Sequence, residues 1–351
     1  MCLVAFLYFI ILRILYYLYI SMILNINDIK WCNLLNINQV YGDFPVNLST
    51  FIHQYDNPAF KDNEKYHFVY DKLFIMKSQD VPSGELNRKH VDEINTDYPI
   101  FIKPRWGHTS AGSKDCYKIK DIDQLSRYVD KPNMMWSSFI NANESMTDFV
   151  MQDGKILYQL TYEYSPKQNE FADDWKYISP QTQAPKKIVE WVHKHLPDYT
   201  GPLNIQYRDD IIIEVSLRFA RRATYLKSTG NTELIENINN TIGNPLHREW
   251  NYSSDTSFRP YYSFKCWSPM NLFYILPNKV MELITQCTGC KKFFEYYFEP
   301  TGKNGTVFFQ FQHHNFKAGM KIKHFIESLT ILCNMFFIIM FFICMFAIHQ
   351  P

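Results

Sequence analysis

The sequence predicts an α+β fold, and three observations carry that prediction. Apolar side chains alternate on both sides of the polar turn at 208–210, which is typical of a hairpin half-buried on one face. Residues 98–104 form a short apolar run that ends in Pro104, and proline closes a strand because it has no N–H group for the ladder. Residues 185–197 carry apolar side chains at helical spacing between two prolines.

Length and composition bound the class of protein. The chain has 351 residues, enough for one large domain or two ordinary ones with appendages. Its formal net charge is +1 and no basic stripe is evident, so the composition argues against a nucleic-acid partner. Eight cysteines are scattered along the chain, two of them in a terminal apolar run. This spacing does not resemble a disulfide framework.

The polar residues of the hairpin share one side of the sheet only in one register. That register pairs Tyr207 with Ile211 across a three-residue loop, in which Asp210 takes the left-handed conformation. A two-residue loop would put Gln206 on the opposite face. The expected face carries an amide, a carboxylate, a hydroxyl and a guanidinium, from Gln206, Glu214, Ser216 and Arg218. Oxygen donors of this kind suit Mg²⁺, whereas the alternative is an ordinary hairpin with a solvated polar face.

A loop of small residues follows the strand at 98–104. Residues 105–113 contain Gly107 and Gly112, and such a loop can lay backbone N–H groups against phosphate oxygens. Lys103, near the end of the strand, adds a positive charge that can reach the same phosphates. The order of lysine strand, small-residue loop and later hairpin therefore indicates a phosphate-binding site.

These segments together resemble the ATP-grasp superfamily, between Lys72 and Gly230. Asn-Ile-Gln followed by Ile-Glu-Val-Ser-Leu-Arg is similar to the metal-binding hairpin of that family, whose usual form is Gln, then Glu-x-Asn-x-Arg. The continuation at 219–230 looks like the ATP-binding domain of the carbamoyl phosphate synthetase large subunit. The resemblance implies two α+β subdomains that clasp a nucleotide, here with a reduced N-terminal region and hydrophobic terminal segments.

The resemblance also implies roles for individual residues. Gln206 and Glu214 would hold Mg²⁺, with Mn²⁺ as an alternative, and Ser216 stands where an asparagine of the family ligates a second metal. Arg218 would face the transferred phosphate, and Arg218 and Lys103 are the catalytic candidates. The backbone groups of Phe139 and Ile140 would form hydrogen bonds with the adenine. The carboxylate of Glu144 would lie near the ribose. The implied nucleotide contacts are Lys72, Lys103, Gly107, Ser110, Gly112, Phe139, Ile140, Glu144 and Gln206.

The domain organisation follows from composition and from the extent of the resemblance. Residues 1–24 are a transmembrane candidate or a start-site artefact, and 25–66 form a short N-terminal region. The ATP-grasp domain is expected at 67–243, followed by an accessory region at 244–326. Residues 329–348 form an apolar run of membrane-spanning length, with a buried core helix as the alternative. Lysines just before this run predict that the globular part lies on the cytoplasmic side.

The resemblance implies an ATP-dependent ligase. Mg-ATP would activate a small-molecule carboxylate as an acyl phosphate, which an amine or a thiol then attacks. The expected partners are ATP, this carboxylate and a membrane, reached through the C-terminal tail and the N-terminus. The alternative is a catalytically weak or inactive nucleotide-binding module that serves as a membrane-tethered scaffold.

Overall fold

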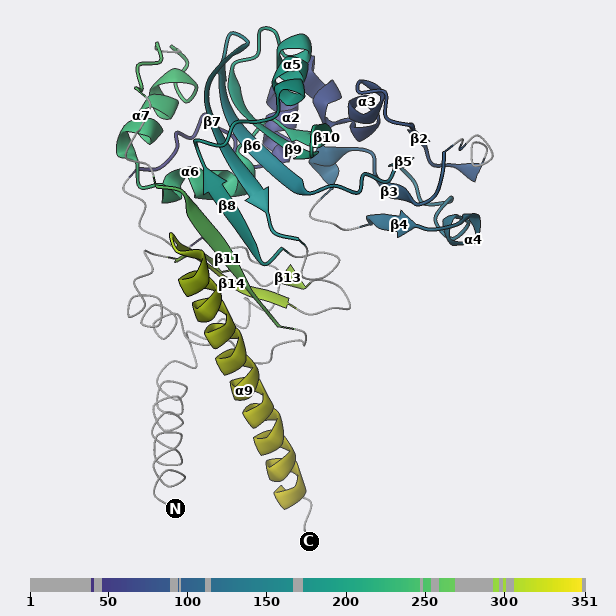
Figure 1. Cartoon of the computed structure of the whole chain (residues 1–351), viewed down its shortest axis with the longest axis vertical. Helices are drawn as coiled ribbons and strands as arrows, with labels where there is room; N and C mark the ends of the chain where they lie inside the picture. The colour runs from purple at the N-terminus through teal and green to yellow at the C-terminus, as the bar shows by residue number, and fades with distance from the viewer. Residues whose placement is uncertain are drawn as a thin grey trace.

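The protein, seen in a computed structural model, is built on two antiparallel sheets (Figure 1). The structure describes residues 39–40, 46–88, 94, 96–110, 115–166, 173–246, 249–253, 259–268, 293–296, 299–300 and 306–348. Side chains are described in these ranges except at 39–40, 293–296, 299–300, 306 and 337–348.

The smaller sheet has four strands in the order β2-β5-β3-β4. Their bounds are β2 (Ser83–Glu85), β3 (Ile100–Pro104), β4 (Tyr117–Ile119) and β5 (Met134–Ser138). Ile100, Ile102 and Trp136 pack on one face into a core shared with Leu125 of α4 (Ile122–Leu125). Because side chains alternate along a strand, Lys103 projects from the other face. The predicted strand at 98–104 is β3.

The larger sheet has ten strands in the described part of the chain. Their order is β1-β12-β14-β11-β8-β7-β6-β9-β10, with β13 paired to β14. The strands are β1 (Gln39–Val40), β6 (Glu144–Gln152), β7 (Lys155–Tyr164), β8 (Trp175–Ser179), β9 (Gly201–Arg208), β10 (Ile211–Ser216), β11 (Tyr261–Ser268), β12 (Phe293–Tyr296), β13 (Glu299–Pro300) and β14 (Thr306–His313).

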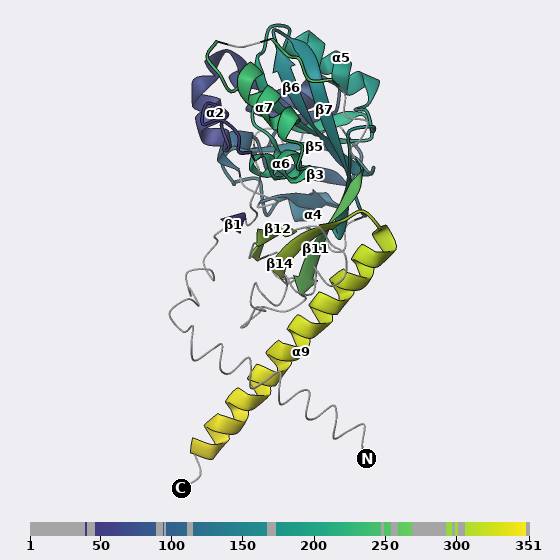
Figure 2. The same ribbon diagram turned by 90° about the vertical axis from the view of Figure 1, so that its left-hand side faces the viewer.

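Helices cover both faces of the larger sheet. The helical segments are α2 (Asp56–Asp62), η2 (Glu64–Tyr70), α3 (Lys72–Lys77), η4 (Gly107–Thr109), α5 (Lys186–His195), η5 (Ala220–Ala223), α6 (Thr224–Ser228), α7 (Thr232–Thr241) and α9 (Phe316–Ile348). α3 and α5 pack on one face of β6, β9 and β10, whereas α6 and α7 cover the other face (Figures 1 and 2). The sheet between these layers is the structural support of the site.

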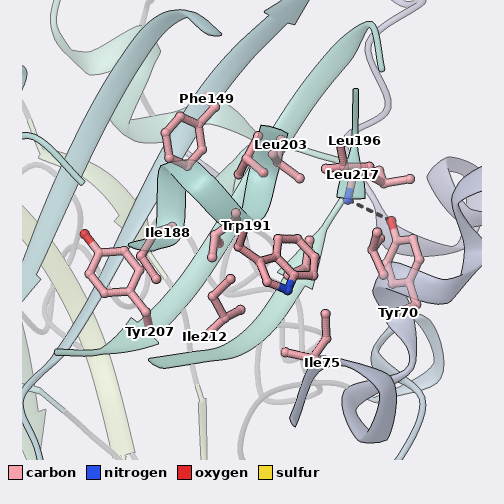
Figure 3. Packing of buried hydrophobic residues seen from close by; sticks show 14 of the residues in the cluster. Tyr70, Ile75, Phe149, Ile188, Trp191, Leu196, Leu203, Tyr207, Ile212 and Leu217 are labelled. Carbon is pink, nitrogen blue, oxygen red and sulfur yellow. Dashed lines mark hydrogen bonds between the residues drawn. The ribbon is translucent and has the colours of Figure 1, made fainter. Parts of the chain in front are cut away.

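The amphipathic pattern at 185–197 forms α5, as predicted. Ile188, Trp191 and Val192 lie on one stripe of the helix and are buried, as their spacing requires. Figure 3 shows Trp191 directed into the cluster between α5, β9 and β10. Burying each such side chain contributes about 1.5–3 kcal/mol. The indole N–H of Trp191 donates to Ser78 Oγ at 2.9 Å, so its polar atom is also satisfied.

The hairpin at 201–216 forms, but its loop differs from the prediction. Arg208 pairs with Ile211 across a two-residue loop, and Asp209, not Asp210, takes the left-handed conformation with φ 52°. A β-bulge at Ile213 then shifts the register, so that Glu214 lies opposite Gln206. The predicted three-residue loop is therefore wrong. The bulge nevertheless places Gln206 and Glu214 on the same face, as predicted.

The predicted membrane spans are not supported by the described residues. Where the structure describes a helix, none is long and apolar enough to cross a membrane. α9 begins at Phe316, well before the apolar run, and packs on β11 and β14 through Ile322 and Ile326. Thr330 and Asn334, inside the predicted span 329–348, are fully buried. The N-terminal candidate at 1–24 lies outside the described residues, and the cytoplasmic location stays a prediction.

Candidate functional site

Three charged residues from separate segments converge where the smaller sheet meets the edge of the larger one. Lys103 of β3 donates to the backbone carbonyl of Ile213 in β10 at 2.8 Å. Lys72, the first residue of α3, lies with its Nζ 3.6 Å from Glu214 Oε2. Both lysines are buried, whereas about a third of the Glu214 side chain is exposed. The two sheets thus bring two cations and one carboxylate to a single location.

The electrostatics of Lys103 suit an anion-binding role. Burial, together with the nearby charge of Lys72, lowers the pKa of Lys103 to about 8, and Glu214 partly opposes this shift. The lysine therefore remains largely protonated at neutral pH. Among the residues that the structure describes, no carboxylate contacts Lys103 directly. Such a buried cation gains much from an incoming anion, because water no longer screens it.

The metal-ligand candidates lie on one face of the hairpin. Gln206 and Glu214 are opposite each other in the register, and Ser216 is opposite Asn204. Among the described residues, no group of three or more His, Cys, Asp and Glu side chains surrounds a metal position. One carboxylate, one amide and one hydroxyl fit a magnesium ion that phosphates and water complete, rather than one held by protein alone.

Arg218, at the end of the hairpin, is held by an acidic residue that the sequence did not point to. Asp56 Oδ2 accepts a hydrogen bond from Arg218 Nε at 2.8 Å and forms an ion pair with Nη2 at 2.6 Å. Nη1 donates to the carbonyl of Phe219 at 3.1 Å. Asp56 begins α2, so the N-terminal region reaches the end of the hairpin.

Comparison with solved structures identifies the fold. An L-amino acid ligase from Bacillus licheniformis superposes with a TM-score of 0.53 and 14% identity, over 76% of this chain and 71% of that one. A carboxyaminoimidazole ribonucleotide synthase from Aspergillus clavatus, complexed with ATP, gives 0.49 and 11%, over 77% and 76%. A phosphoribosylglycinamide synthetase from Anaerococcus prevotii gives 0.43 and 13%, over 77% of each.

The chain has an ATP-grasp fold. The L-amino acid ligase carries this conclusion, and its low identity extends it no further than the fold. Comparison with protein-family models gave no match, and comparison with curated protein sequences gave none. The finer resemblance to carbamoyl phosphate synthetase stays a prediction.

The structure describes the first part of the small-residue loop at 105–113, where the sequence predicts a flap that starts at its root η4. Gly107 is buried in the short turn η4, and Ser110 follows it. Lys72 Nζ donates to Ser110 Oγ at 2.9 Å, which ties the flap root to the lysine that lies beside Glu214. Gly112, the second predicted flap glycine, lies outside the described residues. The flap therefore starts within reach of the phosphate-binding candidates.

The predicted adenine hinge is braced by an arginine that sequence reasoning missed. Arg208 Nη2 pairs with Glu144 Oε2 at 3.0 Å, and Nη1 donates to the carbonyl of Ile140 at 3.3 Å. The N–H of Phe139 donates to the carbonyl of Pro99 at 3.3 Å. The ion pair with Arg208 uses one oxygen of Glu144, and the predicted ribose contact would use the other. The roles of these residues toward adenine and ribose stay predictions.

Asp148 is a third residue that the sequence did not indicate, after Asp56 and Arg208. It is 1% exposed, and its Oδ1 accepts from Asn204 Nδ2 and from the backbone N–H of Ala220, both at 2.9 Å. Its Oδ2 accepts from the Tyr162 hydroxyl at 2.6 Å. Burial raises the pKa of Asp148 to about 6 despite these donors. The available signal was an isolated carboxylate in the otherwise uncharged run at 146–151, which forms part of β6.

Proposed function

We propose that the protein is an ATP-dependent ligase, which activates a substrate carboxylate as an acyl phosphate for attack by an amine. The observation that carries this proposal is the meeting of Lys72, Lys103 and Glu214 between the two sheets of an ATP-grasp fold. A triphosphate supplies the anionic oxygens that such a pair of buried lysines requires.

The side chains of the site have distinct parts in this proposal. Lys72 and Lys103 bind phosphate oxygens and offset the negative charge that develops during phosphoryl transfer. Gln206 and Glu214 hold magnesium, which neutralises phosphate charge when it is bound. Arg218 orients the transferred phosphate, because its planar guanidinium offers several fixed donors. The flap that starts at Gly107 excludes water, which would otherwise hydrolyse the acyl phosphate.

The first test is calorimetric titration with ATP in the presence and absence of Mg²⁺. Lys103→Met should weaken ATP binding in both conditions, because it removes a buried cation. Glu214→Gln should reduce the Mg²⁺ dependence specifically. Lys187→Met is the matched control, since Lys187 is exposed on α5 and pairs with Asp210 on the hairpin surface. Equal ATP binding by wild type and Lys103→Met would reject the site.

The second test measures the reaction. Phosphate release from ATP is followed while pools of carboxylates and amines are added, and mass spectrometry identifies any ligated product. Amino acids are the first compounds to screen, because the ligase from Bacillus licheniformis is described as an L-amino acid ligase. Substrate-dependent phosphate release that Arg218→Gln abolishes is the expected result.

A nucleotide-binding module of weak or no activity is the second candidate. Ser216 favours it, because the side chain is 4% exposed and stands where the resemblance expects an asparagine ligand. A hydroxyl coordinates magnesium more weakly than a carboxylate does, so a second metal would be poorly held. Ser216→Asn distinguishes the candidates, since it should create or raise phosphate release if the hydroxyl limits activity. Mg²⁺-dependent ATP binding without product in both proteins supports the module.

A further inference from the structure

The ion pair between Arg218 and Asp56 joins the end of the hairpin to a residue far away in the chain. The partners are 162 positions apart, and one carboxylate oxygen accepts the Nε–H of Arg218 and lies 2.6 Å from its Nη2. About a fifth of each side chain is exposed, 23% for Arg218 and 16% for Asp56. This exposure leaves the pair partly shielded from water, so its geometry is better defined than that of a surface pair.

The pair uses only part of the hydrogen-bonding capacity of Arg218. A guanidinium group has five N–H donors. Within the described residues the Nε–H donates to Asp56 and one Nη1–H donates to the carbonyl of Phe219, while Nη2 faces Asp56 Oδ2 at 2.6 Å in the ion pair. Two donors are left, at Nη1 and Nη2, and they can bind an oxyanion without breaking the contact with Asp56.

The backbone around Arg218 is fixed on both sides. Before it, the N–H of Leu217 donates to the Tyr70 hydroxyl at 3.0 Å, as the dashed line in Figure 3 shows. After it, the N–H of Ala220 donates to Asp148 Oδ1 at 2.9 Å. With the backbone held in this way, the remaining freedom is in the long side chain of Arg218, and Asp56 sets its direction.

α2 is itself anchored beside the flap. Phe60, one turn after Asp56, stacks between the rings of His67 and His108, with centroid distances of 3.6 and 3.7 Å. His108 belongs to the flap root η4, and His67 belongs to η2. The stack therefore fixes the helix that carries Asp56 against η4, the described start of the predicted phosphate-binding loop.

We propose that Asp56 is a positioning residue, which aims Arg218 at the terminal phosphate of the bound nucleotide. The short N-terminal region thereby completes the site. This inference rests on the proposed nucleotide binding and adds a residue to it. It predicts that Asp56 matters for ATP, which carries the terminal phosphate, and not for ADP, which lacks it.

The test compares the Kd values of Mg-ATP and Mg-ADP by calorimetry in the full chain. Asp56→Asn should raise the Kd for ATP about tenfold, as expected when a charged hydrogen bond that orients a ligand-binding group is lost. The Kd for ADP should stay within about twofold of wild type. Asp62→Asn, on the exposed end of the same helix, is the matched control and should change neither value. In an Arg218→Gln background, Asp56→Asn should have no further effect.

Each other outcome has a definite meaning. An unchanged ratio of the two Kd values in Asp56→Asn overturns the proposal. A lower Kd for ATP overturns it as well, and shows that the carboxylate competes with phosphate for Arg218. Asp56→Ser keeps a residue that favours a helix start, so it serves if Asp56→Asn does not fold. Loss of ADP binding in both variants would make Asp56 a structural residue. Failure of wild type to bind either nucleotide would instead refute the proposed function.

Discussion

The buried carboxylate of Asp148 leads to a prediction about stability as a function of pH. The perturbation is Asp148→Asn, which preserves shape and most contacts. The amide oxygen keeps the bonds from Asn204 and from the N–H of Ala220, whereas the amide nitrogen faces the Tyr162 hydroxyl. A hydroxyl can accept as well as donate, so the network survives the change of donor.

The magnitude follows from the pKa of Asp148. Burial raises it from 3.8 to about 6, and this difference corresponds to about 3 kcal/mol between the two protonation states. Between these values the folded protein binds a proton that the unfolded chain has already released. The free energy of unfolding contributed by Asp148 therefore falls as pH rises from 4 to above 6, and is constant at higher pH. Asparagine does not titrate, so the variant lacks this term.

The assay is urea unfolding, followed by tryptophan fluorescence, at several pH values from 4 to 7.5. The free energy of unfolding of Asp148→Asn, measured relative to wild type, should rise by about 2–3 kcal/mol across this range. Glu190→Gln, an exposed position on α5, is the control and should show no such trend. A constant difference between Asp148→Asn and wild type, or one that falls with pH, would refute the assignment of a raised pKa.

Three further predictions concern other parts of the molecule. Lys103 has a pKa of about 8, so it loses the charge that binds phosphate as the pH rises further. The Kd for ATP should therefore rise about tenfold per pH unit above pH 8. A Kd that stays constant from about pH 7 to 9.5 in calorimetry would contradict this. Asp173 bridges two buried lysines, Lys176 at 3.1 Å and Lys265 at 2.5 Å. Asp173→Asn should therefore lower the free energy of unfolding in urea by about 3–5 kcal/mol. A loss below about 1 kcal/mol would argue against the shared ion pair. Gly154 has φ +73°, and a Cβ there would meet a backbone carbonyl oxygen at 1.9 Å. Gly154→Ala should therefore lower the free energy of unfolding by roughly 2–4 kcal/mol in the same assay. An unchanged value would mean that the turn rearranges.

Much of the site was predictable because its residues lie in contiguous patterns. Lys103 stands at the end of an apolar strand, and Glu214 stands in a hairpin of clear alternation, so the order of the segments was informative. The partners of the predicted residues were not predictable. Asp56 reaches Arg218 across 162 positions and Arg208 reaches Glu144 across 64, and each contact depends on how whole layers pack. Local periodicity contains no information about such distances.

Two errors have physical causes that the sequence pattern does not record. The loop of the hairpin is one residue shorter than expected, because a bulge in the middle of a strand changes the register as effectively as a longer loop does. The apolar run at 329–348 suggested a membrane span, yet its first part belongs to a helix that packs on the larger sheet. Lys323 and Glu327, one turn apart on that helix, are buried together as an ion pair. Because the two opposite charges pair with each other, the face of α9 that carries them can pack inside the protein.

The extra residue in β10 has a consequence for the state without nucleotide. Ile213 has no partner in the ladder, and its carbonyl oxygen is the atom that receives Lys103. A lysine ammonium group has three N–H donors, so this bond keeps Lys103 ordered while another donor can reach an arriving phosphate. Deleting that single residue would leave Glu214 opposite Gln206 in a regular ladder, but it would remove the carbonyl group that holds Lys103 in place.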